Sequence, residues 1–176
     1  EITTQANLDI DELIRETILE IGYNSNELGF NGSECNIIKL LTKQSPDIQM
    51  GVDREEKKNQ GAGDQGLMFG YATNETEFLM PSPIYYSHRL VEKQTNLLKT
   101  GAVSWLRPDA KSQVTFQYEK DKPTFVDTVV LSTQHSNDIS LEELREYVKQ
   151  EIIFDVIPEN LINDNTRIFI NPTGNF

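Results

Sequence analysis

Three stretches of the chain carry apolar residues at intervals of three or four, which is the period of an amphipathic helix. Each begins with residues that favour a helix start, and a glycine follows each of the first two. The stretches and these signals are residues 10–21 (Asp9, Glu12, Gly22), 82–99 (Ser82, Pro83, Gly101) and 140–152 (Ser140, Glu143). His88 shares the apolar stripe of the second predicted helix, so we expect a packed, hydrogen-bonded histidine there rather than a ligand.

Shorter apolar or alternating runs predict strands. They are residues 35–41, 67–73, 114–118, 125–131 and 167–170, and a turn over residues 120–123 predicts a hairpin. From residue 67 the order is strand, helix, strand, strand, helix, strand. This is the split βαβ (βαββαβ) arrangement, an α+β fold whose antiparallel sheet carries both helices on one face. We expect an incomplete copy of it, or a partner domain, in the first 60 residues. The fold alone does not reveal a function.

A long polar stretch separates the two parts. Residues 42–66 combine mixed charges with few apolar anchors, and such a loop is usually a lid, a binding loop or disordered. Near its end Gly61, Gly63 and Gly66 have the G-x-G-x-x-G spacing of dinucleotide sites. Such a site needs a strand before the glycines and a helix after them, whereas here a charged run precedes them and a predicted strand follows. We therefore reject a dinucleotide fingerprint.

Composition narrows the possible classes. The 176-residue chain is 37% hydrophobic and 25% charged, as ordinary globular proteins are, and no apolar run approaches the ~20 residues that span a bilayer. We therefore expect no membrane partner. The net charge of −12 repels phosphate backbones, so we expect no nucleic-acid partner, although a nucleotide held by a few cations and a metal is compatible with it. The single cysteine, Cys35, fits a reducing compartment and is expected to be a buried small hydrophobe.

Three places offer candidate chemistry. Residues 105–111 place the only tryptophan, a cation and an acid–cation pair beside a proline. The alternative to a functional site here is a strand-entry turn with a surface ion pair. Asp64 lies among glycines, so a ligand or another backbone can approach its carboxylate closely. The alternative for that stretch is a flexible lid hinge. Residues 44–48 open the polar loop and are equally typical of a simple turn.

These places carry a resemblance to the S-adenosylmethionine synthetases (methionine adenosyltransferases), which runs over essentially all 176 residues. It rests on residues 1–4, Lys-Gln-Ser-Pro-Asp-Ile (43–48), Gly-Ala-Gly-Asp-Gln-Gly (61–66), Arg-Pro-Asp-Ala-Lys-Ser-Gln-Val-Thr (107–115) and Asn-Pro-Thr-Gly (171–174). The resemblance implies the end of an N-terminal domain (1–60, with a mobile active-site loop over 44–60) and a central domain (61–176). Because the chain lacks the family's His-Pro-Asp-Lys and Gly-Leu-Thr-Gly-Arg-Lys segments, we expect a fragment of a longer protein.

In the family, the methionine sulfur attacks the 5′ carbon of ATP and displaces the triphosphate, which is then hydrolysed to phosphate and diphosphate. The resemblance implies ATP and L-methionine as substrates, Mg²⁺ and K⁺ as cofactors with ligands mainly outside these residues, a homodimer or dimer of dimers with shared active sites, and a cytoplasmic location. The implied roles are methionine contacts by Glu1, Gln44 and Asp64, ATP contacts by Asp109, Ala110, Lys111, Asn175 and Phe176, catalysis by Lys111 and Asp64, and loop closure by Gln44, Asp47, Gly51 and Arg54.

One residue departs from the family pattern. Asn175 stands where family members have arginine after Pro-Thr-Gly, and its amide keeps hydrogen bonding but loses the charge. This departure and the missing segments leave an alternative, a non-catalytic assembly or ligand-binding homologue that retains the central domain. On the leading interpretation too, we expect this stretch alone to be inactive.

Overall fold

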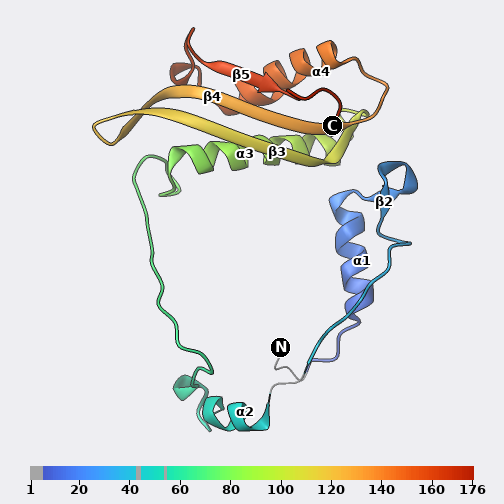
Figure 1. The fold of residues 1–176 in the computed structure, drawn as a ribbon, viewed down its shortest axis with the longest axis vertical. Coiled ribbons are helices and arrows are strands. Elements are labelled where there is room, and N and C mark those ends of the chain that lie inside the picture. Colours follow the sequence, from blue (N-terminus) through green and yellow to red (C-terminus); the bar gives the residue numbers. More distant parts are fainter. Residues whose placement is uncertain (1–5, 43–44, 54) are drawn as a thin grey trace. The chain divides into compact units, whose positions relative to one another are not determined.

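The computed structural model describes residues 6–42, 45–53 and 55–176, and Figure 1 shows their elements. The chain divides into two compact units. The first comprises residues 1–20 and 24–71, and the second comprises residues 21–23 and 72–176.

A three-stranded sheet forms the centre of the second unit. Its strands are β3 (Leu106–Glu119), β4 (Lys122–His135) and β5 (Arg167–Ile170), in the spatial order β3-β4-β5. β3 and β4 pair antiparallel around a turn in which Lys120 and Asp121 have φ angles of 48° and 64°, the left-handed backbone that a tight hairpin needs. The predicted hairpin is confirmed, and both of its strands are longer than the alternating runs indicated.

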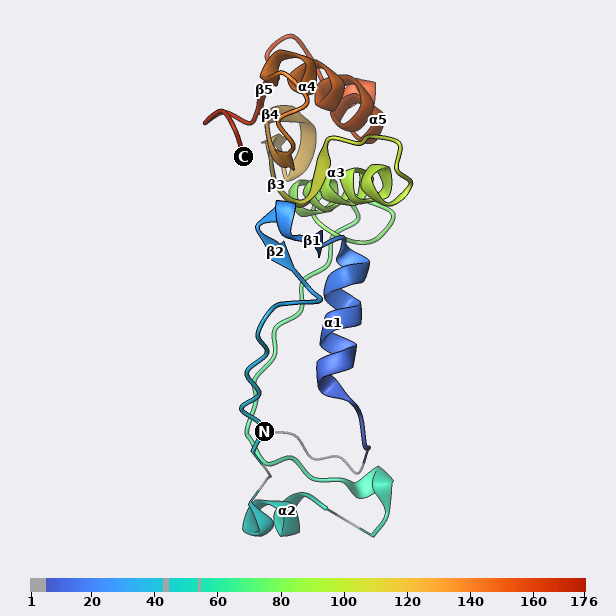
Figure 2. The ribbon, with the colours of Figure 1, turned by 90° about the vertical axis from the view of Figure 1, so that its right-hand side faces the viewer.

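Helices cover one face of this sheet, as Figure 2 shows. They are α3 (Ser82–Lys99), α4 (Leu141–Val148) and the short α5 (Phe154–Val156), with a π-helical turn over Lys149–Ile153 and a 3-10 turn over Glu159–Leu161. α4 begins with the predicted capping box, because Ser140 Oγ accepts a hydrogen bond from Glu143 N and the Glu143 carboxylate accepts one from Ser140 N. The capping box of α4 and the predicted helix over residues 82–99 are therefore confirmed, although α3 begins at Ser82 without a side-chain cap bond.

The core of the second unit lies between these helices and the covered face of the sheet. The alternation along β3 shows this, because Val114 and Phe116 are buried whereas Thr115 and Gln117 are exposed. The buried apolar residues of this core are Leu90, Val114, Phe116, Val126, Val129, Leu131, Leu144, Val148, Ile152, Ile153, Ile157 and Ile170.

The first unit is built from shorter elements. Most of α1 (Ile10–Ile21) belongs to it, and Asp9 Oδ1 accepts a hydrogen bond from Glu12 N at 3.1 Å, as a helix N-cap does. After α1, β1 (Asn24–Ser25) pairs antiparallel with β2 (Phe30–Asn31) around a 3-10 turn over Asn26–Leu28. The predicted first helix is thus confirmed.

The polar stretch is not wholly irregular. It contains α2 (Pro46–Val52), which has a proline in its first turn, and a 3-10 turn over Lys57–Asn59. The described residues of the predicted loop over 44–60 therefore include a helix and a 3-10 turn. Whether this stretch closes over a ligand stays a prediction.

Two predicted strands do not form. Residues 67–73 have no regular structure, and the side chains of Leu67, Met68, Phe69 and Tyr71 are 79–92% exposed. Without that strand between them, β4 and β5 pair directly and in parallel, over Thr128–Leu131 and Arg167–Ile170. The prediction of a fully antiparallel sheet is therefore wrong, whereas the α+β class and the one-sided helices hold.

The other missing strand is residues 35–41. Ile38 and Leu40 are 84% and 89% exposed, and no strand among the described residues pairs with this segment. Cys35 is only half-buried, which contradicts its expected burial.

His88 on α3 is exposed, which contradicts the packed position expected for it. The buried face of α3 runs through Leu90 and Gln94 instead of the stripe that the periodicity indicated.

Candidate functional site

The first half of β3 brings an acid and a cation to one side of the strand. Lys111 Nζ lies 2.9 Å from Asp109 Oδ2, and the two side chains are 64% and 44% exposed. Positions two apart on a strand project to the same side, so this pair follows from the local sequence. Its exposure leaves room for both groups to meet a ligand.

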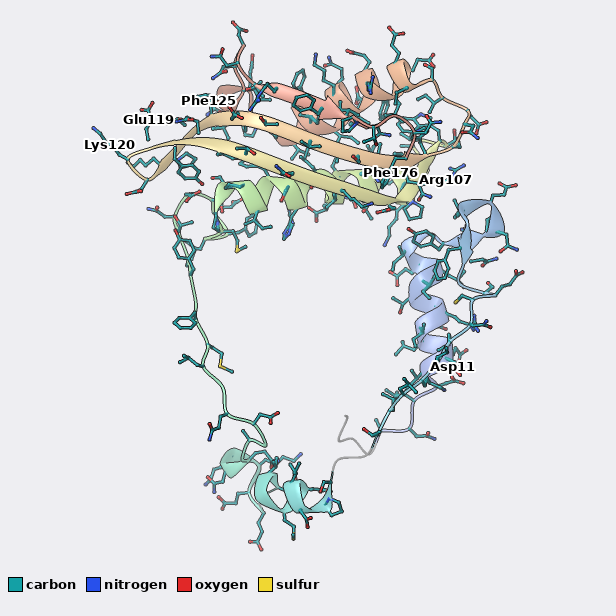
Figure 3. The ribbon with its side chains drawn as sticks, in the orientation of Figure 1. Asp11, Arg107, Glu119, Lys120, Phe125 and Phe176 are labelled. Atoms are coloured by element: carbon teal, nitrogen blue, oxygen red, sulfur yellow. The ribbon has the colours of Figure 1, made fainter. Side chains whose placement is uncertain are left out.

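The end of the chain joins this pair. The Lys111 ammonium lies 4.0 Å from the centroid of the Phe176 ring, within the range of a cation–π contact. Figure 3 shows Phe176 and Arg107 at the end of the sheet where β3 begins, and Glu119 and Lys120 at the opposite end, at the hairpin tip. We call Asp109, Lys111 and Phe176 the acid–cation–ring cluster.

Two glutamines hold the backbone beneath this cluster. Gln134 Oε1 accepts a hydrogen bond from Asp109 N at 3.4 Å. Gln94, whose side chain is 1% exposed, donates from Nε2 to the carbonyls of Arg107 and Asp109, each at 3.5 Å, and its buried Oε1 has no partner. Sequence reasoning missed both glutamines. A glutamine among the apolar positions of α3 was the available signal for Gln94, because a buried amide needs backbone partners.

The Arg107 guanidinium is already committed to its own turn. Its Nη1 donates to the carbonyls of Ser104 and Leu106, at 2.9 and 2.8 Å. Of the two cations, Arg107 and Lys111, Lys111 is therefore the one whose charged group lies beside Asp109 and Phe176.

In the first unit, the glycine-rich run packs against α2. Gly61 N donates to Val52 O at 2.8 Å, and a Cβ atom on Gly61 would lie 2.9 Å from Gly51 O. A Cβ on Gly63 would lie 3.3 Å from Ile48 Cγ2. At Gly61 the glycine-rich run thus lies backbone to backbone with the end of α2. Whether a ligand or another backbone approaches the Asp64 carboxylate, or the stretch is a lid hinge, stays a prediction.

Hydrogen bonds to Asp53 close the same loop. Gln60 Nε2 donates to Asp53 Oδ1 and Gln49 Nε2 donates to Asp53 Oδ2, both at 2.9 Å. The bond from Gln60, followed by that from Gln49, lowers the pKa of the Asp53 carboxyl below its ordinary value. Asp53 thus links α2 to the residue that immediately precedes the glycine-rich run.

Two comparisons with known families show what this chain is related to. The family described as "S-adenosylmethionine synthetase, central domain" matches residues 59–176, and "S-adenosylmethionine synthetase, N-terminal domain" matches residues 1–46. The chain belongs to the S-adenosylmethionine synthetase family. The resemblance seen in the sequence is thereby confirmed, and the family is one of methionine adenosyltransferases. The boundary between residues 60 and 61 stays a prediction.

The residues that the family resemblance singled out fall into three groups. Glu1, Gln44 and Arg54 lie outside the described residues. Asp47, Gly51 and the exposed Asp64 belong to the first unit, whereas Asp109, Ala110, Lys111, Asn175 and Phe176 belong to the second. Within the second unit, Asp109, Lys111 and Phe176 come together. The meeting of Asp64 with Lys111 at one synthetase site stays a prediction.

S-adenosylmethionine synthetases use Mg²⁺ and K⁺. Among the described residues, no group of three or more His, Cys, Asp or Glu side chains is arranged to hold a metal ion. The cluster offers one carboxylate, Asp109, and it is paired with Lys111. These residues alone therefore do not make a Mg²⁺ site, for which several oxygen ligands are needed.

In the described part of the chain, no helix is long and apolar enough to cross a membrane.

Proposed function

We propose that this chain is part of a methionine adenosyltransferase, which makes S-adenosylmethionine from ATP and L-methionine and releases phosphate and diphosphate. The observation that carries the proposal is the acid–cation–ring cluster. Lys111 and Phe176 are 65 positions apart in the sequence, yet Lys111 Nζ lies 4.0 Å from the centroid of the Phe176 ring. Both residues belong to segments that the family resemblance assigns to ATP. The family match over both domains supports the same conclusion.

The proposed chemistry needs positioning and charge rather than a base. The methionine sulfur carries no proton to remove, so no general base is required at the nucleophile. The barrier falls mainly through alignment of sulfur with the 5′ carbon and through neutralisation of the charge that builds on the leaving triphosphate. Any Mg²⁺ would supply further neutralisation from ligands that the described residues do not provide.

Lys111 is the residue we propose for that electrostatic role. Its side chain is 64% exposed, so a phosphate oxygen can reach the ammonium while the carboxylate of Asp109 and the ring of Phe176 hold its direction. Asp109 also offers acceptor oxygens to a hydroxyl donor of the nucleotide, which a second cation at this position would not. The pair therefore suits a ligand that carries both phosphates and hydroxyl groups.

The second candidate is a non-catalytic homologue that binds a ligand or assembles with a partner. Asn175 favours it, because an asparagine at that position cannot supply the charge of the family's arginine. The two candidates differ in one respect that can be measured. Only the enzyme forms S-adenosylmethionine, and only the enzyme loses turnover when the cluster is altered.

The test is Lys111→Met in the protein expressed with the sequence that flanks it in its gene, assayed for S-adenosylmethionine formation from ATP and methionine. We expect a fall of ~10²-fold in turnover, larger than the loss of ATP affinity, because a donor that acts mainly in the transition state is removed. Lys122→Met, at the exposed start of β4 by the hairpin tip, is the matched control and should retain full turnover. Equal rates for Lys111→Met and the unchanged protein would contradict the assignment. No turnover in the unchanged protein would favour the non-catalytic candidate.

We also infer that a second copy of the chain covers part of this protein. The run 67–71 is apolar and almost fully exposed, and soluble proteins seldom leave such a run in water. A homodimer or dimer of dimers with shared active sites would bury it. Light scattering at micromolar concentration should show at least a dimer, and a stable monomer would contradict the inference.

The family and the single cysteine favour a cytoplasmic location, which cell fractionation tests.

A further inference from the structure

We propose that Asn171 is a positioning residue: it holds residues 172–176 against the sheet so that Phe176 reaches Lys111. The contact between Asn171 and the sheet is independent of any ligand, whereas its consequence for nucleotide binding rests on the function proposed above. Asn171 directly follows β5, and its side chain is 1% exposed. A buried asparagine at a strand end needs partners for every polar atom it carries.

The Asn171 side chain continues the pairing of β4 and β5 by one residue. Its Oδ1 accepts a hydrogen bond from Thr133 N at 2.9 Å, and its Nδ2 donates to Thr133 O at 3.0 Å. Its own backbone N–H donates to Leu131 O at 3.1 Å. An amide side chain thus makes the two bonds to Thr133 that a backbone would make, which leaves the backbone after Asn171 free to turn away.

The Asn171 backbone is held in that turn. Its φ angle is 42°, in the left-handed region, where asparagine is tolerated better than most residues. Its carbonyl accepts hydrogen bonds from Gly174 N at 3.1 Å and from Arg145 Nη2 at 2.9 Å, while Arg145 Nε donates to Ile170 O at 2.9 Å. Gly174 has a φ of 101°, which completes the reversal of the chain.

The register of the sheet connects this turn to the cluster. Thr133, which Asn171 binds, pairs with Ala110 on β3, and Ala110 lies between Asp109 and Lys111. Asn171 therefore fixes the last residues of the chain to the sheet position that carries the acid and the cation. The turn closed by the hydrogen bond from Gly174 N to Asn171 O leads directly to Phe176, and we infer that this anchor determines where its ring lies.

Asparagine is the residue type that this position requires. Aspartate would place a second acceptor against the carbonyl of Thr133, where a donor is needed. Glycine allows the same φ angle but removes both bonds to Thr133. Asn171→Gly is therefore the sharpest test, since it separates the side-chain bonds from the backbone conformation. Asn165→Gly, at an exposed position in the loop before β5, is the matched control.

The experiment uses the chain itself and measures two quantities by NMR. The first is the upfield shift of the Lys111 Hε protons caused by the Phe176 ring, for which Phe176→Leu sets the zero. The second is ATP affinity by titration. We expect Asn171→Gly to lose the ring-induced shift and to bind ATP about tenfold more weakly, which corresponds to ~1.4 kcal/mol. The cross-strand contacts of β3 with β4 should persist, and Asn165→Gly should match the unchanged chain in both quantities.

The outcomes separate this proposal from the proposed function. An unchanged ring-induced shift in a folded Asn171→Gly would overturn the positioning role. Failure of the unchanged chain to bind ATP would count against the nucleotide site, while the ring shift would still decide the role of Asn171. If Asn171→Gly does not fold, Arg145→Met decides: it removes two bonds to the same turn and should reduce the ring-induced shift, and an unchanged shift there would overturn the proposal.

Discussion

The two units of this chain differ in what their apolar residues do. In the second unit they form a closed core, in which Leu90, Val129 and Leu144 are completely buried. In the described part of the first unit no apolar side chain is buried, and Leu40 and Phe69 are 89% and 92% exposed. Both units have similar local sequence signals. The difference teaches that a periodic apolar pattern determines an element, whereas burial requires a second element to cover it.

The first and largest expected effect compares one substitution in the two units. Leu144→Ala should lower the free energy of unfolding by ~3 kcal/mol, because it removes a fully buried side chain and leaves a cavity. Leu40→Ala should change it by less than ~0.5 kcal/mol, because that side chain is already in water. Urea unfolding of both variants measures the two values. A loss of similar size for Leu40→Ala would show that the first unit has a core of its own.

A second prediction concerns the beginning of the second unit, where Glu75 ties the segment before α3 to the hairpin. Its carboxylate accepts hydrogen bonds from Ser82 N at 2.8 Å, from the Tyr118 hydroxyl at 2.7 Å and from Thr73 Oγ1 at 3.3 Å. Glu75→Gln should cost ~1.5 kcal/mol of stability at neutral pH, since hydrogen bonds to a charged acceptor are lost or weakened.

The pH dependence of that effect has a definite sign. Burial raises the pKa of Glu75, but the bonds from Ser82, Tyr118 and Thr73 together lower it below its ordinary value of 4.5. A carboxyl with a lowered pKa in the folded state stabilises the protein above its unfolded pKa, and this stability is lost as the pH falls through the folded pKa. The gap between Glu75→Gln and the unchanged chain should therefore narrow in urea titrations as the pH falls below the ordinary pKa of 4.5 toward the lowered pKa of the folded state. A gap that widens in acid would contradict the assignment.

The smallest expected effect compares two serines at helix starts. Ser140 caps α4 through its hydroxyl, whereas Ser45 precedes α2 without a side-chain cap bond. Ser140→Ala should therefore lower the free energy of unfolding by ~1 kcal/mol, and Ser45→Ala should leave it nearly unchanged. Thermal unfolding monitored by circular dichroism distinguishes them. Equal losses would mean that α2 contributes to stability as α4 does.

Much of the fold was predictable because its signals are local. The capping box at Ser140 and the turn at Lys120 and Asp121 act over a few residues, and each predicted its element correctly. The strand expected at residues 67–73 did not form, because a strand depends on a pairing edge that its own residues do not specify. The parallel pairing of β4 with β5 likewise joins residues far apart in the sequence.

The candidate site divides in the same way. Asp109 and Lys111 project to one side of β3 because they lie two apart on a strand, which the sequence shows. The approach of Phe176 was not predictable by spacing, because it depends on the turn that Asn171 forms with Thr133 far away in the sequence. The support from Gln94 was not predicted because the apolar stripe of α3 was expected to run through His88. The buried face of the helix runs through Leu90 and Gln94 instead.

Hydrogen–deuterium exchange along the whole chain, without ligand and with ATP and methionine together, tests the central difference between the two units most directly. In the free chain, the paired amides of β3 and β4 should exchange at least ~10³-fold more slowly than those of the exposed residues 38–41, because only the former lie in a unit with a closed core. Protection over residues 45–53 and 55–60 should rise when both substrates are present, as for a loop that closes over a site. Residues 38–41 and the loop protected as strongly as β3 in the free chain would contradict the account.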